Sequence, residues 1–240
     1  MADRPDQADL WPQLLGFWPR FMTQDPSGGF YYGYEASAYP EYALLAVDTA
    51  TGLPVAKALS VPLSYDGVVA DGMPEGGWGW AIRRSAHDRL LGREPTIVSA
   101  LEIMIRPDLR GSGLSGRMLS AMRDNVAKLG FTDLVAPVRP SGKQDLEMPI
   151  DEYAYARRDD GLPVDPWLRV HVRAGAGIVN VAHSSMVMTG TLAEWREWTG
   201  LPFDTSGPVE VPQALVPVHC DVAQNQVVYV EPNVWVHHRI

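Results

Sequence analysis

The sequence has little cysteine and little positive charge. Its 240 residues include one cysteine, Cys220, which excludes an intramolecular disulfide and a metal cluster held by several cysteines. Acidic residues number 29 against 20 basic ones, a formal charge of −9, and this balance argues against non-specific attraction to nucleic acid or to an anionic membrane. We therefore expect neither as a partner, and we expect a reducing cytoplasm as the location.

Long apolar runs and several catalytic motifs are also missing. Every apolar run is shorter than a bilayer span, and residues 1–20 are interrupted by aspartate, proline and arginine, unlike the core of a signal peptide. The sequence contains no G-K-[ST] of a Walker loop, no H-E-x-x-H and no G-x-S-x-G. His237 and His238 stand near the C-terminus without a partner at ligand spacing, so we expect an exposed tail there and no metal site.

The sequence is 46% hydrophobic and 20% charged, which is ordinary for a globular protein with a buried core. Its 22 glycines and 20 prolines interrupt the chain often. Hydrophobic periodicity predicts helices at 9–22, 81–91, 114–129, 151–158, 165–173 and 191–198, and strands at 42–48, 53–65, 96–106, 134–138, 178–189, 215–221 and 226–236. This order predicts one α+β domain over 1–240, with an N-terminal helical and aromatic segment at 1–40 and a polar insertion at 139–164.

Glycine and arginine are concentrated where the strand predicted at 96–106 gives way to the helix predicted at 114–129. The connecting segment reads Arg106-Pro-Asp-Leu-Arg-Gly-Ser-Gly-Leu-Ser-Gly116. A helix N-terminus presents unpaired N–H groups and the positive end of the helix dipole, so it suits an anion. Gly111 and Gly113 leave the backbone accessible, and Arg110 adds a positive charge. The segment therefore predicts a cradle for a diphosphate.

The pattern of this segment has more than one interpretation. Gly111, Gly113 and Gly116 match G-x-G-x-x-G of dinucleotide-binding proteins, but that motif follows its strand directly and has an acidic residue after the next strand. Here five residues intervene, and Arg139 follows the strand predicted at 134–138. A Rossmann-type dinucleotide-binding protein is therefore the less favoured alternative, and an ordinary strand-to-helix turn is the other.

A better match is found in a different family. The run Ile103-Met-Ile-Arg-Pro-Asp-Leu-Arg-Gly-Ser-Gly-Leu-Ser115 resembles the central motif of the GCN5-related N-acetyltransferases (GNATs), an apolar strand, a turn containing proline, and R-x-x-G-x-G/A opening a helix. Arg169-Val-His-Val-Arg-Ala-Gly-Ala176 resembles the end of the family's fourth helix. The resemblance implies a mixed, mostly antiparallel sheet flanked by helices, with a splayed central pair of strands.

The resemblance also implies how a co-substrate, acetyl-CoA, would be held. The strand ending at Arg106 would diverge from the strand at 134–138, and the pantetheine chain would pair with main-chain groups between them. Amides at the glycine-rich turn would hold the diphosphate. The implied cofactor-binding residues are Ile103, Met104, Ile105, Arg110, Gly111, Ser112, Gly113, Leu114 and Ser115.

Candidate catalytic residues follow from the same resemblance. The acyl carbonyl would lie near a strand bulge whose N–H polarises it. Glu102 lies close to where some members of the family carry a carboxylate base. His171 stands where the family commonly has a tyrosine that reprotonates the thiolate, and we expect its imidazole to titrate near neutrality, as this role requires. A salt-bridged glutamate and a packed histidine are the structural alternatives. Tyr153 and Tyr155 in the insertion are further sources of a phenol.

The resemblance thus implies an acyltransferase acting on the amine of a small molecule in a ternary complex. Six aromatic residues could line the acceptor pocket: Phe30, Tyr31, Tyr32, Tyr34, Trp78 and Trp80. Acylation of a hydroxyl or hydrazine nitrogen on the same fold, and a CoA-binding module without turnover, remain open alternatives. The chain could also pair as a homodimer.

Overall fold

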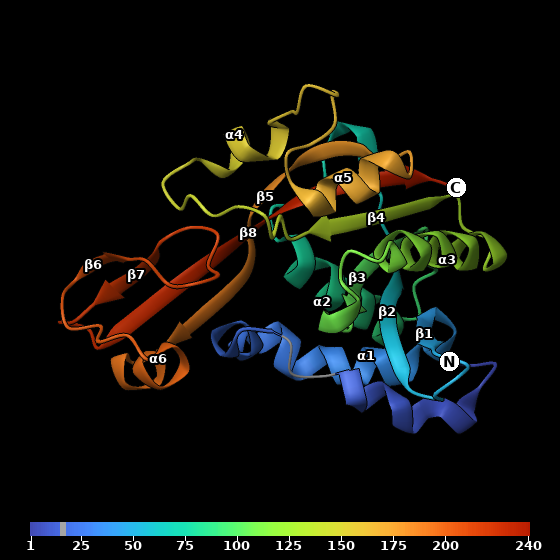
Figure 1. Ribbon diagram of the computed structural model, residues 1–240, viewed down its shortest axis with the longest axis horizontal. Helices are drawn as coiled ribbons and strands as arrows, with labels where there is room; N and C mark the ends of the chain where they lie inside the picture. The colour runs from blue at the N-terminus through green and yellow to red at the C-terminus, as the bar shows by residue number, and fades with distance from the viewer. Residues whose placement is uncertain (15–17) are drawn as a thin grey trace.

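The structure, a computed structural model, describes residues 1–14 and 18–240. Within these residues eight strands form one sheet in the order β1-β2-β3-β4-β8-β7-β6, with β5 paired to β8 (Figure 1). The strands are β1 Ala43–Val47, β2 Pro54–Leu63, β3 Ile97–Ile105, β4 Asp133–Val138, β5 Gly177–Gly190, β6 Gly207–Val209, β7 Val218–Asp221 and β8 Gln226–Arg239. The pairing of β3 with β4 is parallel and the other pairings are antiparallel, as the predicted fold class requires.

Helices cover both faces of this sheet (Figure 1). They are α1 Gly33–Ala38, α2 Gly77–Leu91, α3 Leu114–Lys128, α4 Ile150–Tyr155, α5 Pro166–Arg173 and α6 Leu192–Thr199. One buried cluster joins Met118 and Met122 of α3 and Leu168 of α5 to the sheet, and a second joins Ala81 and Ile82 of α2 to the opposite face. Alternate residues of a strand point to opposite faces, which is why β2 and β3 contribute to both clusters.

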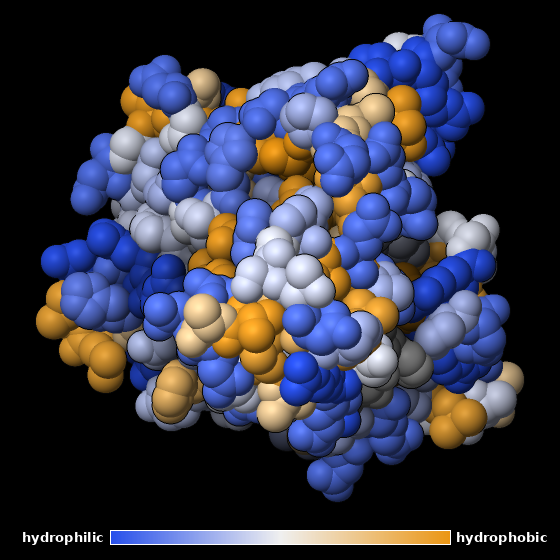
Figure 2. Space-filling view, turned by 90° about the vertical axis from the view of Figure 1, so that its left-hand side faces the viewer, coloured by the Kyte–Doolittle hydropathy of each residue, from blue (hydrophilic) through white to orange (hydrophobic). Residues whose placement is uncertain are grey.

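A third buried cluster holds the end of the molecule formed by β6, β7 and α6, which projects at the left of Figure 1. Trp195 of α6 is fully buried there against Phe21 and Phe203. On the face shown in Figure 2, hydrophobic side chains occur in small groups between hydrophilic ones. Of the helices in residues 1–14 and 18–240, none is long and apolar enough to cross a membrane.

Several helix predictions are confirmed together with their capping residues. The Asp165 carboxylate accepts hydrogen bonds from the N–H groups of Trp167 and Leu168 at the start of α5. Thr191 and Glu194 form a reciprocal capping box at the start of α6. These polar side chains satisfy N–H groups that the first turn of a helix leaves unpaired.

Other predictions are wrong. The helix predicted at 9–22 is replaced by short 3-10 helices at Pro5–Leu14 and Arg20–Gln24, since Pro12 and Pro19 lack the N–H that an α-helix needs; residues 15–17 of that prediction lie outside the described residues. The expected C-terminal tail is the end of β8, whose strand runs on to Arg239. His238 consequently lies inside the sheet and is buried.

Candidate functional site

The central feature of the site is a gap that opens between β3 and β4. Their parallel pairing covers Val98 with Leu134 and Ser99 with Val135, after which β3 continues to Ile105 and β4 to Val138. Each strand keeps its other neighbour over this stretch, β2 along β3 and β8 along β4. Each strand therefore stays hydrogen-bonded to its outer neighbour while β3 and β4 diverge.

Backbone direction shows which groups of β3 face the gap. The Arg106 N–H donates to the Val55 carbonyl, so the main-chain N–H and C=O groups at this position point toward β2. Successive residues of a strand direct their N–H and C=O groups to opposite edges. The main-chain groups of Ile103 and Ile105 therefore point to the other edge, toward β4, where an extended ligand can pair with them.

Two adjoining cavities occupy the gap and its mouth. The first, the groove, has a volume of about 1010 Å³ and is lined by Ile103, Met104, Ile105, Arg110, Gly111, Ser115 and, farther along, Arg139, Lys143, Gln213 and Leu215. The second, the splay cavity, has a volume of about 400 Å³ and is lined by residues 100–104 of β3, residues 136–139 around the end of β4, and Asp25, Tyr32, Lys57, Trp78, His171, Glu231 and Asn233. Trp18, Met104, Arg139 and Trp167 line both cavities, which therefore meet at these side chains.

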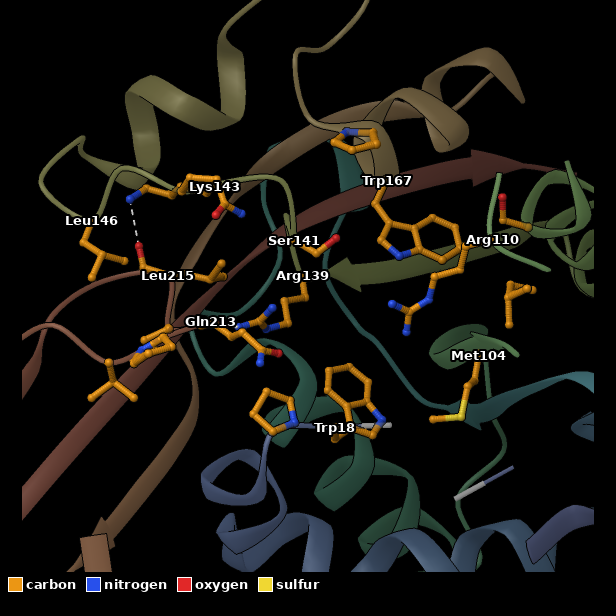
Figure 3. Close-up of a pocket in the computed structure, with 18 of the residues that line it drawn as sticks. Trp18, Met104, Arg110, Arg139, Ser141, Lys143, Leu146, Trp167, Gln213 and Leu215 are labelled. Atoms are coloured by element: carbon orange, nitrogen blue, oxygen red, sulfur yellow. Dashed lines mark hydrogen bonds between the residues drawn. The ribbon is translucent and has the colours of Figure 1, made fainter. Parts of the chain in front are cut away.

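The groove has two distinct ends (Figure 3). Arg110 lies at one end, and Lys143 lies at the other, where its ammonium donates to the carbonyl of Leu215 at 2.7 Å. Trp18 and Trp167 lie on opposite sides of the space between these ends. A long, narrow ligand can therefore extend from Arg110 toward the point where the groove meets the splay cavity.

The turn before α3 has the backbone that an anion site requires. Gly111 and Gly113 both have φ of +80°, a conformation that L side chains adopt at a cost. A Cβ built at either position meets no atom within 4 Å, so the space beside the turn is open. The Ser112 N–H is used within the turn, donating to Leu109 O at 3.3 Å, whereas the N–H groups of α3's first turn have no intrahelical acceptor.

The structure gathers the predicted cofactor-binding residues along one surface. Six of them line the groove: Ile103, Met104, Ile105, Arg110, Gly111 and Ser115. Ser112, Gly113 and Leu114 complete the turn between Gly111 and Ser115. Arg106 is held by Asp108 through bonds of 2.7 and 3.0 Å, which leaves Arg110 as the cation directed to this end of the groove.

A bulge in β3 places Glu102 in the splay cavity. Leu59 of β2 pairs with Glu102 and Ser60 pairs with Ala100, so Leu101 is an extra residue, and its carbonyl accepts a hydrogen bond of 2.8 Å from Trp78 Nε1. An extra residue in one strand re-aims the side chain that follows it. Glu102 thus points to the face covered by the N-terminal segment, where it contributes to the wall of the cavity.

Three side chains interact with the carboxylate of Glu102. Lys57 Nζ lies 3.2 Å from Glu102 Oε2, and the hydroxyl of Tyr32 donates to the same oxygen. Trp18 Nε1 donates to Glu102 Oε1 at 3.1 Å. Lys57 is fully buried and its ammonium lies 4.9 Å from the centre of the Trp11 ring. Burial and the neighbouring carboxylate raise the pKa of Tyr32 well above its usual value, so its hydroxyl stays protonated and donates to Glu102.

His171 forms a pair with His238 behind the splay cavity. Its Nδ1 lies 2.9 Å from His238 Nε2, and its ring packs against Trp167 with centroids 5.9 Å apart. Burial, with a smaller contribution from His238, lowers the pKa of His171 to about 3; burial, Arg123 and His237 lower the pKa of His238 to about 4. The expectation that His171 titrates near neutrality is therefore wrong, and both rings are neutral at physiological pH.

The other candidates lie elsewhere. Tyr153, on α4 within the insertion, is buried with its hydroxyl 3.4 Å from Asp165, and Tyr155 is 47% exposed. Both side chains lie outside the linings of the groove and the splay cavity. Of the six aromatic candidates, Tyr32 and Trp78 line the splay cavity, while Phe30 and Tyr34 point to solvent.

An ion pair that sequence reasoning missed lies where the two cavities meet. Arg139, directly after β4, donates through Nε to Glu231 Oε1 at 2.5 Å, and Tyr229 donates to Glu231 Oε2 at 2.6 Å. Glu231 is fully buried, and burial raises its pKa against the opposing effect of Arg139. A lone glutamate within an apolar strand is the sequence feature that could have identified Glu231. Lys57 could have been found in a similar way, because it is a lone lysine in the apolar strand β2.

No protein-family model matches the chain. It is 32% identical over 270 residues to the arginine N-acetyltransferase avaD of Aspergillus versicolor, an alignment that covers 100% of this chain and 92% of that protein. Among solved structures it resembles the loading GNATL domain of CurA from Lyngbya majuscula, with a TM-score of 0.56, 18% identity, and coverage of 98% of this chain and 93% of that domain. It also resembles the GphF GNAT-like decarboxylase in complex with isobutyryl-CoA, with a TM-score of 0.56, 15% identity, and coverage of 98% and 96%. The two structures show the same fold.

Within residues 1–14 and 18–240 no group of three or more histidine, cysteine, aspartate or glutamate side chains is arranged to hold a metal ion.

The neutral histidine pair makes stability depend on pH. Because the folded pKa of each ring lies below the ordinary 6.5, its stabilisation is complete above pH 6.5 and is lost as the pH falls toward 4 for His238 and toward 3 for His171. At pH 5 we expect a loss of about 2 kcal/mol per ring relative to pH 7.5. Urea unfolding at both pH values should show a smaller loss for His171→Phe than for the wild type. His219→Gln, which changes an exposed histidine, should keep the wild-type loss, and equal losses in all three proteins would contradict this account.

Proposed function

Because the chain belongs to the GCN5-related N-acetyltransferase superfamily and transfers an acyl group from acyl-CoA to an amine, we propose that the group is acetyl and that the acceptor is a small cationic amine related to arginine. The full-length similarity to an arginine N-acetyltransferase supports both parts. The charge and aromatic character of the splay cavity is the observation that carries the acceptor class.

The lining of the splay cavity suits a positively charged molecule. Its acidic side chains, Asp25, Glu102 and Glu231, outnumber its basic side chains, Lys57 and Arg139. The rings of Trp18, Tyr32 and Trp78 add faces that attract a cation. Asp25 is held in place by the N–H groups of Gly28 and Val187, at 2.8 and 3.2 Å. A guanidinium or ammonium group is the ligand that this combination favours.

The groove suits the acyl-CoA substrate. The amides of Gly113 to Ser115 and the guanidinium of Arg110 would hold the diphosphate, because the turn is open and electropositive. The main-chain groups of Ile103 and Ile105 would pair with the pantetheine amides along the gap. This substrate supplies a thioester carbonyl that an amine can attack.

We assign Glu102 to the acceptor. Its carboxylate would attract the amine and accept, directly or through water, the proton that nitrogen must lose as the C–N bond forms and the C–S bond breaks. The N–H groups on the gap-facing edge of β3 would polarise the carbonyl oxygen as negative charge develops on it. Lys57 and Tyr32 hold Glu102 in the orientation it needs for this task.

We assign His171 to the departing sulfur. A ring whose pKa is about 3 carries no proton to give up as an imidazolium at neutral pH, so it would act as a neutral hydrogen-bond donor to the developing thiolate. Its position on α5, where the ring lines the splay cavity beside Trp167, supports this role. The thiolate then takes its proton from the proton released at nitrogen or from solvent.

Closing the space at the glycine turn tests the CoA site. Gly113→Val puts a branched side chain beside the first-turn amides of α3, and we expect CoA affinity, measured by calorimetry, to fall more than about tenfold, the equivalent of one charge-assisted hydrogen bond. Gly130→Val is the matched control, because Gly130 also has a positive φ and an open surrounding but lies at the other end of α3. Equal CoA affinity in the two variants would contradict the assignment.

The role of Glu102 can be separated from its structural pairing with Lys57. Glu102→Gln alone should lower kcat/KM for acetyl transfer to arginine by about 10²- to 10⁴-fold, but it also leaves the buried Lys57 unpaired. The double variant Lys57→Met/Glu102→Gln removes both charges and should restore thermal stability without restoring activity. Recovery of activity in the double variant would show that Glu102 serves the fold alone.

The pH dependence of a His171 variant distinguishes a neutral donor from an imidazolium acid. We expect His171→Phe to lower kcat by about 10²-fold, as loss of a single donor to a developing charge does elsewhere, with little change in CoA affinity. Since the ring stays neutral, the ratio of wild-type to variant kcat should be constant from pH 5.5 to 9. A ratio that falls tenfold per pH unit over part of this range would instead identify an imidazolium acid.

A further inference from the structure

The His171–His238 pair joins α5 to the last strand of the sheet. His238 stands opposite Leu134 in the pairing of β8 with β4, and its side chain is 1% exposed. Residues two apart on β8, Val234 and Val236, belong to the buried cluster that also holds Leu168 of α5, so His238 points to the same face. The two ring centroids are 5.2 Å apart. His238 is therefore placed by the sheet, and it contacts His171 from behind.

Only two proton arrangements are compatible with one hydrogen bond between two neutral imidazoles. In the first, His238 donates from Nε2 to Nδ1 of His171, so His171 carries its own proton on Nε2. In the second, His171 donates from Nδ1, so its Nε2 is a bare acceptor and His238 carries its proton on Nδ1. The arrangements present opposite chemistry to the cavity that His171 lines, a donor in the first and an acceptor in the second.

The surroundings of His238 favour the first arrangement. Among the described residues its Nδ1 is buried and has no hydrogen-bond partner. An orphaned N–H is rarer and more costly in a protein interior than an orphaned acceptor, so the proton belongs on the other nitrogen. The positive charge of Arg123, close enough to lower the basicity of His238, also favours a lone pair over an N–H at this ring. His237 is engaged separately, with its Nε2 2.7 Å from Asp133.

We propose that His238 is a positioning residue that donates its Nε2–H to Nδ1 of His171 and so fixes the tautomer in which His171 presents an N–H to the splay cavity. This proposal rests on the role assigned to His171 under the proposed function. It adds the residue that makes a neutral imidazole a donor rather than an acceptor at the sulfur. The tautomer itself is a property of the resting protein and can be measured without any substrate.

Long-range proton–nitrogen NMR of protein labelled with ¹⁵N-histidine reads the tautomer directly, since protonated and bare ring nitrogens resonate far apart. The spectra of His171→Phe and His238→Phe assign the two rings among the six histidines. We expect both His171 and His238 of the wild type to carry the proton on Nε2 between pH 6 and 8. A proton on Nδ1 of either ring would overturn the proposal, whatever the catalytic role of His171.

Kinetics test whether the tautomer matters. We expect His238→Phe to lower kcat by about tenfold with an unchanged KM for acetyl-CoA, the lower end of what loss of an orienting partner costs a functional histidine elsewhere. His238→Gln, whose amide can donate to Nδ1, should recover most of this loss and should keep the His171 proton on Nε2 in the NMR spectrum. Equal kcat in the wild type and both variants would show that the pair only packs. If His171→Phe also leaves kcat unchanged, the proposed role of His171 fails, while the tautomer result still stands.

Discussion

The parting of β3 from β4 is the constraint on which the rest of the site depends. Two parallel pairs hold the strands together at one end, and β2 and β8 remain paired with β3 and β4 where these separate. An unpaired strand edge inside a protein has main-chain donors and acceptors that need partners. A substrate with amide groups along an extended chain would supply those partners, which is why we propose that the acyl-CoA pairs with the edge of β3.

The site combines two opposite ways of handling buried polar groups. On one face of the sheet, Glu102 forms an ion pair with Lys57 and accepts hydrogen bonds from Trp18 and Tyr32. On the other face, His171 and His238 are kept neutral by burial and satisfy one another. The bulge at Leu101 permits this division, because it turns Glu102 away from the face that holds the histidines. The residues that we assign to the amine and to the departing sulfur therefore lie on opposite faces of the sheet.

Much of this arrangement could be predicted from local sequence. The strand, glycine turn and helix around Gly111 to Ser115 follow from positions a few residues apart, and so do the caps at Asp165 and Thr191. Contacts between distant segments could not be predicted in the same way. The partners of Glu102 come from residues 18, 32 and 57, and the partner of His171 comes from a strand end that has the composition of a tail. The burial of His171 itself is the main cause of its lowered pKa, and His238, which is placed behind it because β8 extends to Arg239, adds a smaller contribution.

A crystal structure of the chain with a non-reactive acyl-CoA analogue tests the central claim most directly. The account predicts the pantetheine chain between β3 and β4, with its amides bonded to the main chain of Ile103 and Ile105 and its diphosphate at the first turn of α3. Its acyl end should enter the splay cavity beside the bulge at Leu101. A structure in which the analogue binds elsewhere while side chains fill the space between the two strands would contradict it.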